Sequence, residues 1–157
     1  MHALAIKFLR VALVVLLLGC LLAQVLVPMF ASEEGRIFPE FAYLVVPYSG
    51  AGILAIGCVQ VALLVVWRLL SMVNDGAIFT RPALHWVDVI TACAAIATVL
   101  FAAPLIHVLF FVGVGGPLVL WLAASLAGGL SFVLLMIVMR GLLEAAIADR
   151  TELDETI

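Results

Sequence analysis

The side chains that could do chemistry in this sequence gather around one short connection, residues 74–88, between two long apolar segments. Arg81, His85 and Asp88 follow one another at spacings of four and three residues, which places them on one face of a helix. Arg68 lies near the end of the preceding apolar segment and is expected at a similar depth. Ionisable side chains beside an apolar span are costly unless paired, so two interpretations follow. We favour an ion pair of Arg68 or Arg81 with Asp88 that locks two helices together; the alternative is a pH- or ligand-responsive histidine site.

No pattern in the sequence indicates an enzyme. It lacks GxSxG, HExxH and Walker-type motifs, and no pair of acids lies inside an apolar segment. Cys20, Cys58 and Cys93 lie within apolar segments, without a CxxC spacing or a neighbouring histidine. We interpret them as small buried side chains and not as metal ligands or disulfides. We therefore expect no catalytic, metal or cofactor site.

The composition is typical of an integral membrane protein. Of the 157 residues, 68% are hydrophobic and 11% are charged, and the mean hydropathy is +1.39. Soluble domains contain about 45–50% apolar and about 25% charged residues. A soluble fold would leave much apolar surface in water, whereas lipid removes the need for a polar exterior. The net charge of −3 and the absence of a basic run give no indication of direct nucleic-acid binding.

Four apolar stretches are long enough to cross a bilayer as helices, which takes about 20 residues each. The sequence therefore predicts an all-α integral membrane protein, a single domain with spans at residues 8–29, 48–72, 86–110 and 118–138. Residues 31–47 are expected to form a connector at the membrane surface. The first span is expected to be an uncleaved helix, because no convincing cleavage site follows it.

The distribution of basic residues predicts the orientation. Placing both termini in the cytoplasm leaves only Arg36 outside. The basic residues on the inner side are then Lys7, Arg10, Arg68, Arg81, Arg140 and Arg150.

Small residues indicate where the helices would pack, because lipid supplies no hydrophobic drive between them. The fourth span carries Ala123, Ala127 and Ser131 at four-residue spacing. The face that holds Asp88 continues into small and apolar residues of the third span, so we expect it to point toward other helices; these are Ala92, Ala95 and Val99. A homodimer that uses such faces is an alternative.

Gln24 and Gln60 are the polar residues inside the first and second spans. We interpret them as interhelical hydrogen-bonding residues, worth about 0.6–2 kcal/mol each, and not as a transport site. With the first span ending at residue 29, Gln24 would lie near the outer face and Gln60 near mid-depth. The two side chains are therefore not expected to meet.

The connection between the second and third spans reads as a tight turn. Gly76 suits the left-handed position after a helix end. Thr80 suits the N-cap of the next helix, and Pro82 falls in its first turn. Phe79 and Leu84 stand at the positions of a hydrophobic staple.

The helix of the fourth span is expected to continue past Arg140 into the cytoplasm, where residues 139–157 form an amphipathic and acidic tail. Its apolar face is Leu142, Leu143, Ala146 and Ile147. Its acidic end would be solvated or bound to a basic protein partner; this candidate partner-binding segment is Glu152, Asp154, Glu155, Thr156 and Ile157.

The run from Asn74 to Arg81 and the ending from Glu152 to Ile157 resemble a bacterial family of small four-helix membrane proteins, domain of unknown function 2975. The resemblance makes Gly76, Phe79 and Thr80 the family turn and implies a bacterial inner-membrane location. Members are often encoded beside a small helix-turn-helix regulator, which implies such a regulator as partner. No activity comes with the resemblance.

Three functions are compatible with these features. The first is a non-enzymatic regulatory, sensing or scaffold module that binds a partner through its tail and central turn. The second is a small transporter or channel, which the lack of an acidic residue at mid-membrane disfavours, since Asp88 lies near the inner face. The third is an accessory subunit of a larger membrane complex.

Overall fold

The computed structural model of the protein describes residues 2–76, 80–113 and 116–156. Within these ranges the chain is helical: α1 His2–Ile37, the 3-10 helix η1 Pro39–Leu44, α2 Val45–Asn74, α3 Arg81–His107, the π-helical turn η2 Val108–Val112, and α4 Pro117–Glu155. Four of these helical stretches are long and apolar enough to cross a membrane. This confirms the predicted all-helical class and indicates a multi-pass membrane protein.

The helices extend beyond the predicted spans. The spans were predicted from the apolar stretches alone, whereas each helix continues into the polar residues on either side. The clearest correction concerns residues 31–47, which do not form one connector. α1 continues to Ile37, and its last turns carry an Arg36–Glu33 ion pair of 3.1 Å at a helical spacing. Pro39 then begins η1, and Pro47 falls in the first turn of α2. Proline fits these positions, since the first residues of a helix need no N–H partner inside it.

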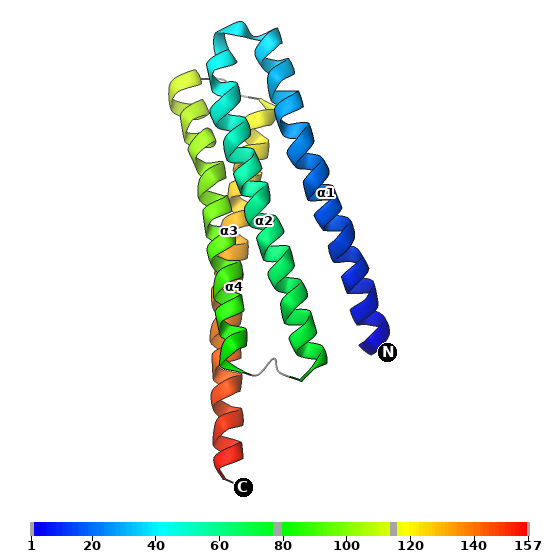
Figure 1. Cartoon of the computed structure of the whole chain (residues 1–157). Helices are drawn as coiled ribbons and strands as arrows, with labels where there is room; N and C mark the ends of the chain where they lie inside the picture. Colours follow the sequence, from blue (N-terminus) through cyan, green and yellow to red (C-terminus); the bar gives the residue numbers. More distant parts are fainter. Residues whose placement is uncertain (1, 77–79, 114–115, 157) are drawn as a thin grey trace.

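Each long helix packs against its neighbours in the sequence: α1 against α2, α2 against α3, and α3 against α4 (Figure 1). The other pairs of long helices have at most marginal contact in the described part of the chain. The result is an open bundle with α1 and α4 at its two edges. Its terminal end holds the start of α1, the end of α2 and the start of α3, and α4 extends beyond that end; its loop end holds η1 and η2 (Figure 1).

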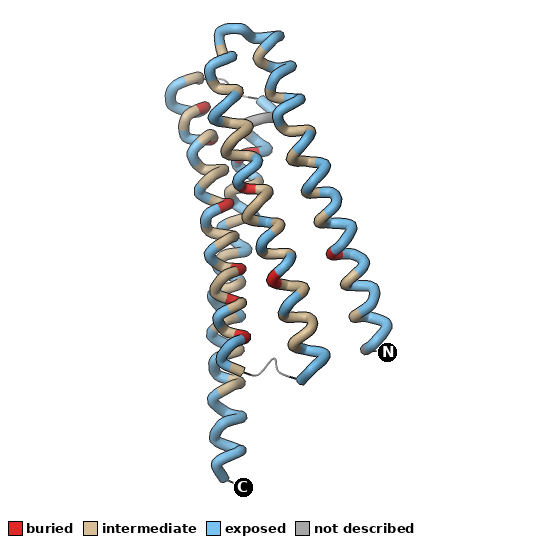
Figure 2. Tube along the Cα trace, viewed as in Figure 1, coloured by how far each residue is buried: buried red, intermediate tan, exposed pale blue. Residues whose placement is uncertain are grey.

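Burial is concentrated on α3, which packs between α2 and α4 (Figure 2). Its buried residues are Ala83, Val87, Ile90, Ala97 and Leu105. The predicted contact face was therefore only partly right: Asp88 and Ala95 are half-buried, whereas Arg81, His85, Ala92 and Val99 are exposed. Because α3 is apolar on nearly every side, its sequence periodicity does not determine which face meets protein and which meets lipid.

Close approaches at glycine fix how the neighbouring helices fit together. A Cβ at Gly129 of α4 would overlap the Thr98 side chain of α3, and one at Gly35 would lie 2.6 Å from Cγ2 of Val45. Small residues thus set helix distances here, as expected in lipid. However, the predicted small-residue face of the fourth span, Ala123, Ala127 and Ser131, is exposed. Its use between two copies of the chain stays a prediction.

Candidate functional site

The Asp88 carboxylate is paired, but with a residue that sequence reasoning did not assign to it. Arg140 of α4 donates from Nε to Oδ1 of Asp88 at 2.6 Å, and from Nη1 to Oε2 of Glu144 at 2.9 Å. We call Asp88, Arg140 and Glu144 the ion-pair cluster. It ties α3 to α4 near the terminal end, and both side chains of the Asp88–Arg140 pair stay roughly half-exposed.

The prediction that Arg68 or Arg81 pairs with Asp88 and locks α2 to α3 is therefore wrong. Arg68 and Arg81 are exposed, and no ion pair joins either to Asp88 among the described residues. The physical reason is that Asp88 lies on the side of α3 that meets α4, not α2. A signal for Arg140 existed in the sequence: a short connection makes the third and fourth helices antiparallel, which brings Arg140 to the depth of Asp88.

His85 does not join this cluster. It is exposed, and its ring meets the ring of Trp86 edge-on, with centroids 5.9 Å apart. Asp88, by contrast, is already bonded to Arg140. The three residues share a helical face as predicted, but the structure does not bring them together as one histidine site.

Arg10 of α1 makes a contact with α2 at the terminal end that the sequence did not predict. The Arg10 guanidinium lies over the Trp67 ring, 5.8 Å from its centroid, which is within the range of a cation–π contact. The Arg10 Nε is buried and has no hydrogen-bond partner within the described residues. Arg10 is thus held by packing against an aromatic face.

Gln24 and Gln60 do meet, contrary to expectation. Gln24 Nε2 donates to Gln60 Oε1 at 3.0 Å, and Gln60 Nε2 donates back to Gln24 Oε1 at 3.3 Å. The error came from ending the first span too early. Gln24 lies 13 residues before Ile37, and Gln60 lies 15 residues after Val45, so both are about 20 Å from the loop end. Their predicted role as interhelical hydrogen-bonding residues is confirmed.

The α2–α3 turn agrees with the sequence where it is described. Gly76 has φ 71°, the left-handed conformation expected after a helix end. Thr80 is extended at the N-cap, and its carbonyl accepts from Ala83 N at 3.0 Å. Phe79, the predicted staple residue, lies outside the described residues.

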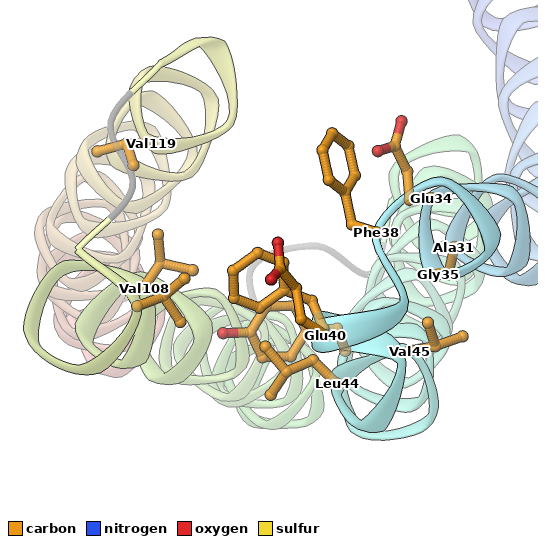
Figure 3. A pocket seen from close by; sticks show the side chains of 12 residues that line it. Ala31, Glu34, Gly35, Phe38, Glu40, Leu44, Val45, Val108 and Val119 are labelled. Atoms are coloured by element: carbon orange, nitrogen blue, oxygen red, sulfur yellow. The ribbon is translucent and has the colours of Figure 1, made fainter.

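At the loop end the helices line an open pocket of about 600 Å³ (Figure 3). We call it the loop-end pocket. Its lining comes from the end of α1, η1, the start of α2, η2 and the start of α4. The lining residues are Ala31, Glu34, Gly35, Phe38, Glu40, Phe41, Leu44, Val45, Tyr48, Val108, Val112 and Val119.

Local backbone features build this pocket. Phe38 N donates to Glu34 O at 2.9 Å, which ends α1, and Phe41 N donates to Phe38 O at 3.0 Å, which starts η1. On the opposite wall, Gly113 has φ 66° and closes η2 by donating to Val108 O at 2.9 Å. The wider π-helical turn places Val108 and Val112 on the same side.

Tyr48 connects the pocket to α3. Its hydroxyl lies 2.8 Å from Nδ1 of His107, and the His107 ring stacks on Phe111 with centroids 5.3 Å apart. His107 therefore holds a lining residue in place. The pocket itself was missed. The signal was the mixture of acidic and aromatic residues between positions 34 and 48, which sequence reasoning assigned to a simple connector.

The helix of the fourth span continues into the tail as predicted, since α4 runs without a break to Glu155. Leu143, Ala146 and Ile147 are half-buried, as expected for an apolar face, whereas Leu142 is exposed. Glu152, Asp154, Glu155 and Thr156 are all exposed, and Ile157 lies outside the described residues.

The described residues contain no group of three or more His, Cys, Asp or Glu side chains that could hold a metal ion. Cys20, Cys58 and Cys93 are free thiols, each half-buried.

A family model described as "Protein of unknown function (DUF2975)" matches residues 29–157. This confirms the resemblance drawn from the turn and the ending. No curated protein and no solved structure matches the chain. The matched region contains the whole loop-end pocket and the ion-pair cluster.

Proposed function

This chain belongs to the DUF2975 family, and because that description gives no activity, we propose a function from the geometry: a non-enzymatic bacterial inner-membrane module that senses or scaffolds and binds a cytoplasmic protein partner. The observation that carries the proposal is α4, one continuous helix from Pro117 to Glu155. Val119 near its start lines the loop-end pocket, and its other end is the exposed acidic segment. One rigid element therefore connects a pocket with a surface suited to a partner.

The ion-pair cluster sets how far α4 projects. Asp88 and Arg140 lie at one level, Arg81 is seven residues before Asp88, and Ile147 is seven residues after Arg140. α3 thus begins level with Ile147, and residues 148–155 extend about 12 Å beyond it. Figure 1 shows this end of α4 beyond the start of α1, the end of α2 and the start of α3. A helix end without helical neighbours is well placed to bind another protein.

The charge of this end supports a basic partner. Asp149, Glu152, Asp154 and Glu155 are exposed on the projecting segment. Anionic lipid would repel them, whereas a basic protein surface would attract them. DNA-binding regulators carry such a basic surface, so the helix-turn-helix regulator implied by the family resemblance is the partner we propose to test first. The cytoplasmic placement rests on the asymmetry of the basic residues.

The proposal is tested by capture of the co-expressed regulator on the full chain, tagged at its N-terminus, in mild detergent. Deletion of residues 149–157 and the substitution Glu152→Gln/Asp154→Asn/Glu155→Gln should both abolish capture, with capture by the wild type falling as salt rises. The matched control, Glu33→Gln, removes an acidic charge at the loop end outside the pocket lining and should leave capture unchanged. Equal capture by the deleted and complete chains would contradict a partner site on this segment.

Transport receives less support from the geometry. The amides of Gln24 and Gln60 bond to each other, so the polar groups at mid-depth are not free to line a path for a substrate. An accessory role in a larger complex uses the same exposed faces of α1 and α4 and is compatible with the proposal.

A further inference from the structure

We infer that the loop-end pocket binds an amphipathic cation, such as a hydrophobic amine or phosphonium ion. The inference names the class of ligand that the proposed module would sense. Only this sensing role rests on the proposed function. The binding itself follows from the volume, the lining and the charge of the pocket.

The volume and lining suit a small hydrophobic molecule. Pockets for such ligands measure about 300–1,000 Å³ and are mostly apolar with a few polar groups, and this one measures about 600 Å³. Phe38, Phe41 and Tyr48 supply aromatic faces, which attract cations through their negative π surface. Val108 and Val112 supply the opposite apolar wall.

The charge of the pocket selects the sign of the ligand. Glu34 and Glu40 line it, and neither forms an ion pair within ranges 2–76, 80–113 and 116–156. No basic residue is among the described residues of the lining. The nearby cation, Arg36, is bonded to Glu33 at 3.1 Å outside the lining. Two carboxylates beside an apolar wall therefore remain without a protein counter-charge.

The Glu34 and Glu40 carboxylates are the negatively charged groups of the pocket. Figure 3 shows the Glu40 carboxylate among the lining side chains and the Glu34 carboxylate beside Phe38. The Tyr48 hydroxyl is already bonded to His107. A neutral lipid chain would cover the apolar wall but gain nothing from the two carboxylates, and an anion would be repelled. An amphipathic cation covers the wall with its apolar part and is attracted by both carboxylates through its charge.

The test uses the full chain in phosphatidylcholine nanodiscs and tetraphenylphosphonium as the probe, measured by equilibrium dialysis against empty nanodiscs. We expect saturable binding to one site per chain. Glu34→Gln and Glu40→Gln should each weaken it about tenfold, the equivalent of about 1.4 kcal/mol. The matched control, Glu33→Gln, removes an equal charge one residue away, and should weaken binding less than about twofold because Glu33 is outside the lining and is already paired with Arg36.

Tetraphenylborate has the same shape and the opposite charge, and it should show no saturable binding above empty nanodiscs. Absence of saturable phosphonium binding, saturable borate binding, or an equal effect of Glu33→Gln would each overturn the inference. These substitutions lie on exposed residues, so the folded state of each variant can be checked by circular dichroism. Regulator capture is measured without the probe, so loss of one result with the other intact separates the two proposals.

Discussion

At the scale of residues, the structure shows the predicted types of interaction, an ion pair and an interhelical hydrogen bond, but between different partners from those predicted. Asp88 is in an ion pair, but with Arg140. Gln24 is in an interhelical hydrogen bond, with Gln60, which sequence reasoning had excluded. In both cases the sequence identified a side chain that needs a partner, because unpaired polar groups beside lipid are costly. It did not identify the partner, because that depends on which helix faces meet.

The ion-pair cluster predicts a specific pattern in mutant stabilities. Asp88→Asn and Arg140→Gln should each lower the unfolding midpoint in detergent micelles. The double variant should be about as stable as the less stable of the two single variants, because each single substitution already removes the bond between Asp88 and Arg140. Arg81→Gln is the control, because Arg81 shares the helical face of Asp88 but does not bond to it. Additive losses from Asp88→Asn and Arg140→Gln would show that the pair contributes nothing.

At the scale of elements, glycine positions decide how closely the helices approach. α4 carries two adjacent glycines with opposite environments. A Cβ at Gly129 would meet the Thr98 side chain, whereas one at Gly128 would have nothing within 4 Å. The pair therefore separates the effect of packing from the effect of helix propensity.

Gly129→Ala should destabilise the protein by about 1–3 kcal/mol, because the added methyl forces α3 and α4 apart. Gly128→Ala should be neutral or stabilising by up to about 1 kcal/mol, since alanine favours a helix over glycine. Reversible unfolding in mixed micelles measures both. Thr98→Ala should restore the stability of Gly129→Ala by removing the overlapping atoms; a failure to restore it would place the cost elsewhere.

At the scale of the whole molecule, the chain is an open bundle whose two ends differ. The terminal end is extended by a projecting acidic helix, and the loop end holds a pocket with two carboxylates. Both proposals use this difference, and both assume that the ends face opposite sides of a membrane.

Cysteine labelling tests that assumption. In a chain with Cys20, Cys58 and Cys93 replaced by alanine, Ser32→Cys should react with a membrane-impermeant maleimide in spheroplasts, whereas Thr151→Cys should react only after permeabilisation. The reason is the excess of basic residues at the terminal end. The opposite labelling pattern would reverse the orientation and remove the cytoplasmic partner from the proposed function.

The sequence by itself determined the class of the protein, the number of its long helices and the glycine that ends α2. These are local properties: an apolar stretch of sufficient length forms a helix in lipid, and a left-handed residue is best supplied by glycine. The ends of the helices were harder, as α1 shows, because polar residues continue a helix past its apolar stretch.

Only the tertiary structure decided that Arg140 pairs with Asp88, that the glutamines meet, and that five elements line a pocket at one end. When nearly every residue of a helix is apolar, no difference between its faces fixes the rotation of that helix about its axis. Rotation and register are then set by the fit of side chains such as Thr98 against Gly129. That fit joins residues far apart in the sequence, so it emerges only when the helices are packed.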